Sequence, residues 1–343
     1  MSIITSGIIL AKRVLPKGIY AFFKQKKHER YWRRIYAYDR DLFLKHSGLR
    51  ETGSQEGFEA MLTMDYHSIE KGLALPAPRP GFGRDNIHKL ASDCLRFFEL
   101  YGVSEVLMSA YGALCHYQQF CEENDVAYQD LWGIINQIKV VLAENAEISD
   151  SSSGVMRVTR EDYWSRAQID VEAFFLSRKS IRDFSDIPVD EQIVRRAIAC
   201  ALHTPSVCNR QSWRIHFFNG KAAARKALSF QNGNRGFGDC VNAVCLITFV
   251  YDGFLRIGER NQGFIDGGML SMSLVYALHG LGLGTCCLNC SNEPRQDQDL
   301  HNGLNIPQNE RPIMMIGIGS IKEDFVVAVS RRKKFEEVVV VHD

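Results

Sequence analysis

The chain has 343 residues, of which 45% are apolar and 24% charged, as in an ordinary globular protein of one large or two smaller domains. The formal net charge is +1, which gives no global field favouring nucleic acid. No segment reaches the unbroken apolar length of a membrane span, and residues 3–10 lack the features of an export signal. The ten cysteines are scattered, so we expect reduced thiols and a cytoplasmic protein.

Residues 12–34 form a locally basic segment in which aromatic side chains alternate with Lys and Arg, and Glu29 is its one acidic residue. A helix of this composition can lie on an anionic membrane surface, which would make a peripheral membrane contact. The alternative is a helix that packs its aromatic side chains on the body of the protein and leaves its basic side chains in water. We favour the alternative.

Apolar residues at helical spacing predict helices over 56–72 and within 86–145, separated by a proline-rich loop at 75–83. No strand pattern of any length precedes residue 150. We therefore predict a helical N-terminal domain over residues 1–150. Within it, His67 and Glu70 share a helix face, and a hydrogen bond between them is a better account than a metal or acid–base site.

The polar stretch 147–155 predicts a linker, and Thr159 with Asp162 predicts the start of the next helix. The second domain is expected over 156–343. Its central stretch, 177–219, begins with an R-x-S-x-R cluster, Arg178, Ser180 and Arg182. Spaced four apart, the two guanidiniums are expected on one helix face, where they form either a phosphate grip or a solvated helix end.

The same stretch continues with an amphipathic helix pattern that must end before Pro205, because proline lacks the N–H that a helix needs. A polar loop, PSVCNRQSW, then leads into a strand. Further along, 243–251 and 313–319 read as buried strands, and 267–280 reads as a helix rich in small residues. This alternation of helices and strands also allows a doubly wound α/β sheet.

Together the R-x-S-x-R cluster, the helix and the PSVCNRQSW loop resemble the FMN-dependent nitroreductase family, with Ser212 in place of the usual proline. The resemblance extends over about 165–343. It implies an α+β fold: a nitroreductase-like, mostly antiparallel sheet flanked by helices, with the N-terminal all-helical domain as an extension. It also implies an intertwined homodimer in which the helix at 267–280 lies in the interface and Pro205-Ser206 comes from the partner chain.

The resemblance carries cofactor roles to matching positions in this chain. Phosphate contacts fall to the R-x-S-x-R cluster and a late basic residue, and flavin contacts fall to three loops, one of which places a backbone N–H opposite flavin N5. The implied FMN-binding residues are Arg178, Ser180, Arg182, Pro205, Ser206, Asn209, Gln211, Asn234, Arg235, Asn289, Cys290 and Arg332. Cys286, Cys287 and Cys290 are better explained as buried strand residues than as a zinc site, because no second pair of ligands lies nearby.

The implied function is an FMN-dependent oxidoreductase that passes hydride from NAD(P)H to FMN and then to a small acceptor, such as a nitro compound, a quinone or a biosynthetic intermediate. FMN would carry the chemistry, so no catalytic side chain is expected. An alternative from another class is an adaptor at a membrane surface or in a complex, whose flavin fold is vestigial. The colour of the purified protein would distinguish the two.

Overall fold

A computed structural model describes residues 16–49, 54–145, 153–165 and 167–342. The α-helices are α2 (Lys17–His46), α3 (Gln55–Leu73), α4 (Arg84–Tyr101), α5 (Glu105–Glu122), α6 (Gln129–Asn145), α7 (Arg160–Ser165), α8 (Val171–Ser177), α9 (Glu191–Ala201), α10 (Lys221–Leu228), α11 (Gln262–Gly280) and α12 (Pro294–Leu304). The strands are β1 (Trp213–Asn219), β2 (Ala243–Val250), β3 (Leu283–Asn289) and β4 (Glu310–Ser320). Five short 3-10 helices complete the set: η1 (Val207–Asn209), η2 (Gly238–Cys240), η3 (Tyr251–Gly253), η4 (Ile257–Glu259) and η5 (Phe335–Glu337).

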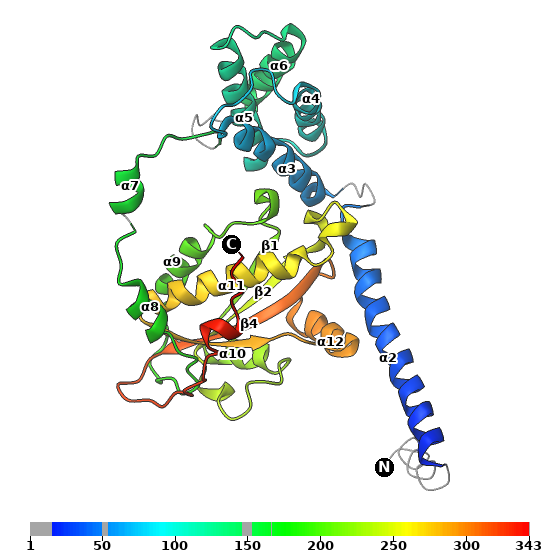
Figure 1. The fold of residues 1–343 in the computed structure, drawn as a ribbon, viewed down its shortest axis with the longest axis vertical. Helices are drawn as coiled ribbons and strands as arrows, with labels where there is room; N and C mark the ends of the chain where they lie inside the picture. The colour runs from blue at the N-terminus through cyan, green and yellow to red at the C-terminus, as the bar shows by residue number, and fades with distance from the viewer. Residues whose placement is uncertain (1–15, 50–53, 146–152, 166, 343) are drawn as a thin grey trace.

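The strands form one antiparallel sheet in the order β1-β2-β4-β3, with helices on both of its faces (Figure 1). Every residue of β2 is buried, and its side chains alternate between two cores. Val244 and Leu246 pack with α10 and α12, whereas Cys245 and Ile247 pack with α9 and α11. This two-sided burial explains the continuous apolar run of β2. The structure confirms the predicted α+β class rather than a parallel, doubly wound sheet.

Helices α3 to α6 pack around a core of their own, which confirms the predicted helical region. Ser54 and Ser104 begin α3 and α5 by accepting backbone N–H bonds from the first turn. His67 Nδ1 lies 2.8 Å from Glu70 Oε2, as predicted, and Glu70 Oε1 accepts a bond from the backbone N–H of Gly154 at 3.0 Å. The pair therefore holds the end of the 147–155 segment against α3.

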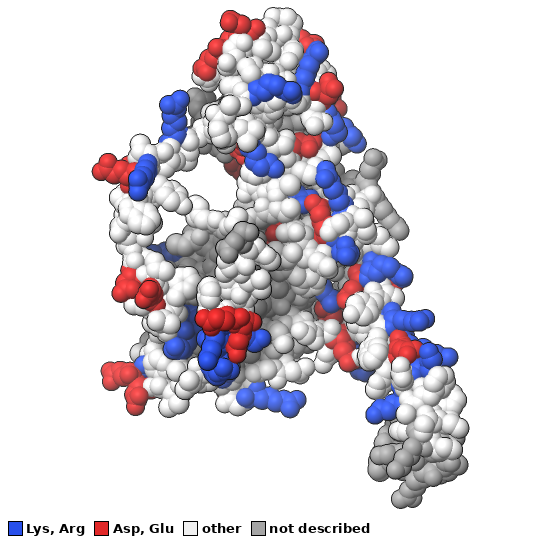
Figure 2. All heavy atoms as spheres, in the orientation of Figure 1, with Lys and Arg blue, Asp and Glu red and all other residues white. Residues whose placement is uncertain are grey.

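Helix α2 packs against the C-terminal part of the chain. Phe43 shares a small buried core with Phe249, Tyr251 and Phe254, and the Tyr38 hydroxyl donates to Asp297 at 2.8 Å. The first half of α2 projects beyond the body of the protein with its aromatic and basic side chains exposed (Figures 1 and 2). The membrane interpretation of 12–34 stays a prediction, and residues 12–15 lie outside the described part. No helix among the described residues is long and apolar enough to cross a membrane.

Residues 153–177 connect the helical region to the sheet by an extended path with two short helices, α7 and α8 (Figure 1). The backbone N–H of Asp162 donates to Thr159 Oγ1 at 3.0 Å, which confirms the predicted helix start. This helix, α7, extends to Ser165, and a second short helix, α8, begins at Val171. A domain boundary near residue 150 stays a prediction.

Candidate functional site

The R-x-S-x-R cluster lies in extended backbone alongside β3, so the predicted helix face is wrong at this point. Ser180 forms a bridge with Thr285, and the backbone N–H of Ile181 donates to the Thr285 carbonyl at 2.9 Å. Ile181 is buried in the core. Because side chains alternate in extended backbone, Arg178, Ser180 and Arg182 share the side opposite Ile181. Residues four apart lie on the same side of the backbone in a helix and also in an extended segment. Arg178 and Arg182 therefore share a side, although the backbone here is not helical.

The C-terminal tail brings Arg332 to this cluster. Arg178, Ser180, Arg182 and Arg332 line one cavity, together with Lys179.

 The volume of this cavity is ≈ 210 Å³. Neither Asp nor Glu is among the residues that line it. Figure 2 shows basic side chains gathered on this side of the molecule, next to the acidic residues of η5. The cavity is therefore strongly cationic.

The basic side chains of this cavity form no ion pair with an acidic side chain among the described residues. Among the described residues, no carboxylate lies within ion-pair distance of Arg178, Arg182 or Arg332. The Arg182 guanidinium lies over the Phe237 ring, 6.0 Å from its centre, which holds it by a cation–π contact. Unmatched, clustered guanidiniums are suited to an anion with several oxygens, because each can donate two parallel hydrogen bonds.

The residues predicted from the sequence do not include all of those at or near this cavity. Lys179 and Phe175 line it, and next to Arg178 in the sequence, Ser177 Oγ lies 2.8 Å from His279 Nε2. Burial, and secondarily the charge of Arg178, lower the pKa of His279. Lys179 lies inside the R-x-S-x-R motif and could have been included, but no pattern in the sequence pointed to His279.

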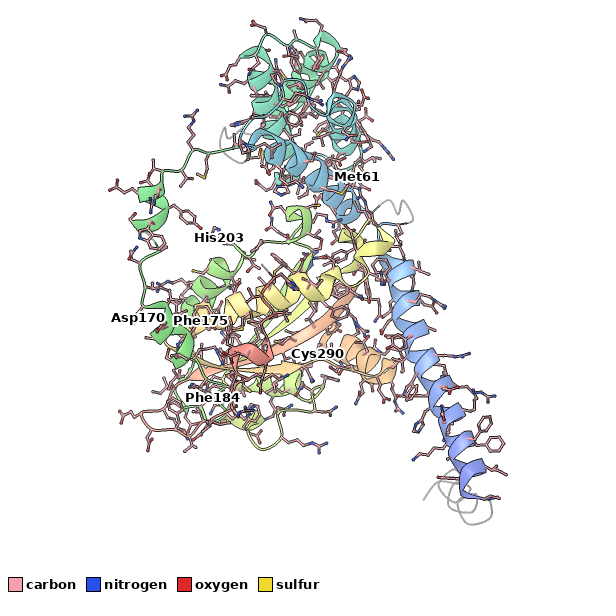
Figure 3. All side chains as sticks on the ribbon, viewed as in Figure 1. Met61, Asp170, Phe175, Phe184, His203 and Cys290 are labelled. Atoms are coloured by element: carbon pink, nitrogen blue, oxygen red, sulfur yellow. The ribbon has the colours of Figure 1, made fainter. Side chains whose placement is uncertain are left out.

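Strand β3 leads from the cavity toward Asn289 and Cys290. Thr285 and Asn289 are four residues apart, about 13 Å along a strand. The Asn289 carbonyl accepts a bond from Gln231 Nε2 at 3.0 Å, which ties the loop after α10 to the end of β3. Burial raises the pKa of Cys290 to about 12, so its thiol is neutral near pH 7. Figure 3 shows Cys290 next to α12 and Phe175 on α8.

Two predicted FMN-binding residues, Asn234 and Arg235, lie in the loop after α10. The Asn234 side-chain amide donates to the carbonyls of Leu228 and Gln231 at 2.8 and 2.6 Å, so it closes the end of α10. Arg235 is exposed, and neither residue lines the cationic cavity. Asn234 therefore stabilises its own loop in this chain.

The loop Pro205–Gln211 lies beside α3, away from α8 and the cationic cavity (Figure 1). Ser206 Oγ accepts the backbone N–H of Gln211 at 2.9 Å, and Gln211 Nε2 donates to the Asn209 carbonyl at 3.2 Å. Asn209 and Gln211 have positive φ angles of 54° and 51°. Within one chain, the structure does not bring this loop to the R-x-S-x-R cluster.

A small hollow lies between this loop and the helical region. Its volume is ≈ 150 Å³, and Glu56 and Glu59 of α3 line it together with Gln211. Next to it, Arg210 forms a buried ion pair with Glu259 at 2.6 Å. Burial opposes the charge of Glu259, but the hydrogen bonds from Arg210 lower its pKa overall.

Residues 176–235 match the model of the nitroreductase family, which confirms the resemblance carried by the sequence motifs. This segment holds both the R-x-S-x-R cluster and the Pro205–Gln211 loop. At a coarse level, the match supports a flavin-dependent oxidoreductase.

One curated relative is a 5,6-dimethylbenzimidazole synthase of Rhodospirillum rubrum, 46% identical over 45 residues, which are 13% of this chain and 21% of that protein. The chain thus spans about a fifth of the length of this relative. Similar solved structures include a nitroreductase in complex with FMN from Desulfovibrio desulfuricans, 18% identical, with a TM-score of 0.45 over 51% of this chain and 98% of that one. An FMN-dependent nitroreductase from Clostridium difficile is 18% identical, with a TM-score of 0.44 over 50% and 100% of the two chains.

Proposed function

We propose that this protein is an FMN-dependent oxidoreductase that takes hydride from NAD(P)H and reduces a small-molecule acceptor. The observation that carries the proposal is the cationic cavity, which is lined by Arg178, Ser180, Arg182 and Arg332 and by no acidic residue. This set of donors fits a phosphate group. It also lies partly within the segment that matches the nitroreductase family.

The residues of the chain would bind and orient the cofactor, which supplies hydride chemistry when it is bound. Arg178, Arg182 and Arg332 would hold its phosphate. The segment Asn289–Cys290, further along β3, would face the ring system, and the high pKa of Cys290 keeps a thiolate away from it. In this scheme the cofactor would supply the electrons, and the further protons that the acceptor takes up would come from solvent.

We propose further that the protein is a homodimer. The exposed face of α11 carries Ile265, Met269 and Met272, which are apolar side chains that a second copy could cover. A partner chain could also supply its Pro205–Gln211 loop, which lies away from the cationic cavity of its own chain. Light scattering of the flavin-loaded protein should give the mass of a dimer. A flavin-loaded monomer at micromolar concentration would contradict the proposal.

The helical region would shape the acceptor site. Glu56 and Glu59 of α3 border the Pro205–Gln211 loop, and they offer no redox group. Helices placed over a bound flavin exclude water and select substrates. Substitutions of Glu59 should therefore change the preference among acceptors and leave FMN affinity unchanged.

The absorption spectrum of the purified protein tests the function directly. A yellow protein that releases FMN, and that NAD(P)H bleaches without oxygen, is the expected result. A colourless protein that FMN cannot reconstitute would rule out the enzyme and favour the adaptor alternative. A yellow protein that neither NADH nor NADPH bleaches would retain the flavin but contradict the proposed electron donor.

A further inference from the structure

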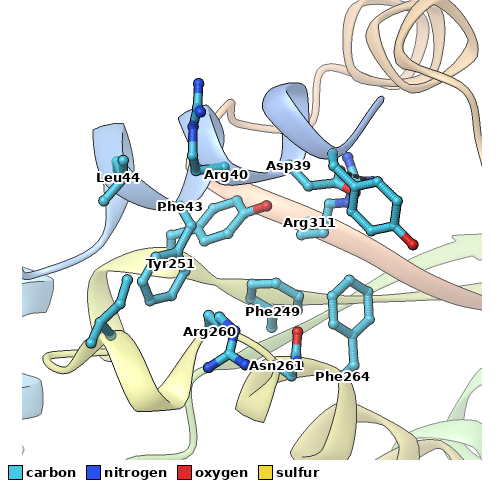
Figure 4. A pocket seen from close by; sticks show the side chains of 12 residues that line it. Asp39, Arg40, Phe43, Leu44, Phe249, Tyr251, Arg260, Asn261, Phe264 and Arg311 are labelled. Atoms are coloured by element: carbon cyan, nitrogen blue, oxygen red, sulfur yellow. Dashed lines mark hydrogen bonds and ion pairs between the residues drawn. The ribbon is translucent and has the colours of Figure 1, made fainter. Parts of the chain in front are cut away.

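A second cavity lies between α2 and the C-terminal part of the chain, with a volume of ≈ 350 Å³. Figure 4 shows it below α2, bordered by the end of β2 and by the segment that leads into α11. None of the residues assigned to FMN lines it. Its volume is within the range of small-molecule sites in proteins.

Aromatic rings form the apolar wall of this cavity. Phe249 is central: its ring centre lies 4.9 Å from that of Tyr251 and 5.1 Å from that of Phe264, with the planes near perpendicular in both pairs. Phe43 of α2 completes the wall. Edge-to-face arrangements like these can extend to a further ring, so the wall favours a flat, aromatic ligand.

The polar side of the cavity carries donors that lack a partner. Within the described part of the chain, the side chains of Arg260 and Asn261 make no hydrogen bond or ion pair, and Asn261 points toward the cavity (Figure 4). Tyr251 is 3% exposed, and its hydroxyl has no hydrogen-bond partner among the same residues. A ligand in the cavity could therefore accept a hydrogen bond from this hydroxyl.

The pairing of charges around the cavity leaves one place for an anion, beside Arg260. Arg311 also borders the cavity, but Asp297 and Asp39 match its charge at 2.6 and 3.0 Å. Arg40 has Asp41 as its partner at 2.7 Å. Arg260 is thus the cation at this cavity whose charge is unmatched among the described residues. A carboxylate beside Arg260 would also come within reach of neutral donors such as Asn261.

We propose that this cavity binds a small aromatic carboxylate, with its ring against Phe249 and Phe264 and its carboxylate on Arg260. Because Phe43 and Tyr36 belong to α2, the bound ligand would also fasten α2 to the C-terminal part. The site goes beyond the proposed oxidoreductase and does not depend on it.

The test uses the full chain saturated with FMN and two probes of equal shape, 2-naphthoate and the neutral 2-naphthalenemethanol. Calorimetric titration should show 2-naphthoate binding with Kd of about 10 µM to 1 mM, as expected for a ligand of this size. The neutral probe should bind at least tenfold more weakly. No heat from 2-naphthoate at millimolar concentration would overturn the proposal.

Variants locate the binding. Arg260→Gln should weaken 2-naphthoate about tenfold and leave the neutral probe unchanged, because it removes only the charge-assisted contact. Tyr251→Phe should weaken it by a smaller factor. Arg295→Gln, on the exposed side of α12, is the matched control and should have no effect. Equal affinity of Arg260→Gln and the parent protein would overturn the assignment. Loss of 2-naphthoate binding in Arg182→Ala would place the probe in the cationic cavity instead, and would also overturn it.

Discussion

Two arginine clusters in this protein are built in opposite ways. At the junction between α2 and the sheet, Arg311 is buried and paired with both Asp297 and Asp39. In the cationic cavity, Arg178 and Arg182 are partly or fully exposed and have no acidic partner among the described residues. The same side chain therefore joins parts of the fold in one place and remains available to a ligand in the other.

The difference shows how charge compensation distinguishes structure from function. A buried guanidinium must be paired, because an isolated charge in a low-dielectric interior costs several kcal/mol. Exposed guanidiniums can stay unmatched at a small cost, and they then attract anions from solution. The following predictions test this contrast, beginning with the largest expected effect.

Asp297→Ala should destabilise the protein most. It leaves the buried Arg311 charge with the half-exposed Asp39 as its remaining carboxylate partner among the described residues, and it removes the acceptor of the Tyr38 hydroxyl. We expect the free energy of unfolding to fall by about 3–5 kcal/mol, measured by denaturant titration. Asp299→Ala, at an exposed position on the same helix, is the control and should change it by less than about 0.5 kcal/mol. An equally small loss of unfolding free energy in both variants would show that the buried, paired arginine is no more important for stability than an exposed one.

Arg182→Ala should affect ligand binding without affecting stability. Losing one charge-assisted contact to phosphate costs about 1.5–3 kcal/mol of binding, so FMN affinity should fall roughly ten- to a hundredfold. Arg178→Ala should behave alike. The free energy of unfolding without FMN should stay within about 0.5 kcal/mol of the parent. Unchanged FMN titrations for both variants would refute the phosphate assignment.

The pair Arg210–Glu259 belongs to the compensated kind and gives a pH dependence. Its hydrogen bonds hold the pKa of Glu259 below the ordinary value, although burial alone would raise it. The pair therefore contributes stability above the unfolded pKa of about 4.3, and this contribution is lost as pH falls through the lower folded pKa. Glu259→Gln should be less stable than the parent at pH 7, and the gap should narrow in acid. A gap independent of pH would show that the charge plays no part.

Glu56→Gln should have the smallest effect. Its ion pair with Arg214 joins α3 to β1 at 2.8 Å, and both side chains are 48% exposed. Solvent screens such pairs, so the loss should be between 0 and about 1 kcal/mol in denaturant titrations. A loss as large as that of Asp297→Ala would mean that exposure does not decide the value of a charge pair here.

The sequence by itself determined the local elements and the family motifs. The apolar run of β2, the helical spacing in α4 to α6 and the end of α9 before Pro205 follow from residue periodicity and backbone chemistry, which act over a few neighbours. The R-x-S-x-R spacing also fixed that Arg178 and Arg182 share a side, although the backbone there is extended and not helical.

Only the tertiary structure decided which distant residues meet. It places Arg332 in the same cavity as Arg178, and it pairs Arg311 with Asp39 of α2. It also directs the Asn234 amide to a hydrogen bond within its own loop. Such contacts depend on how whole elements pack and on where each buried charge finds its partner. The spacing of apolar residues along the sequence does not determine these contacts. It specifies which face of an element is buried, but not which other element packs against that face.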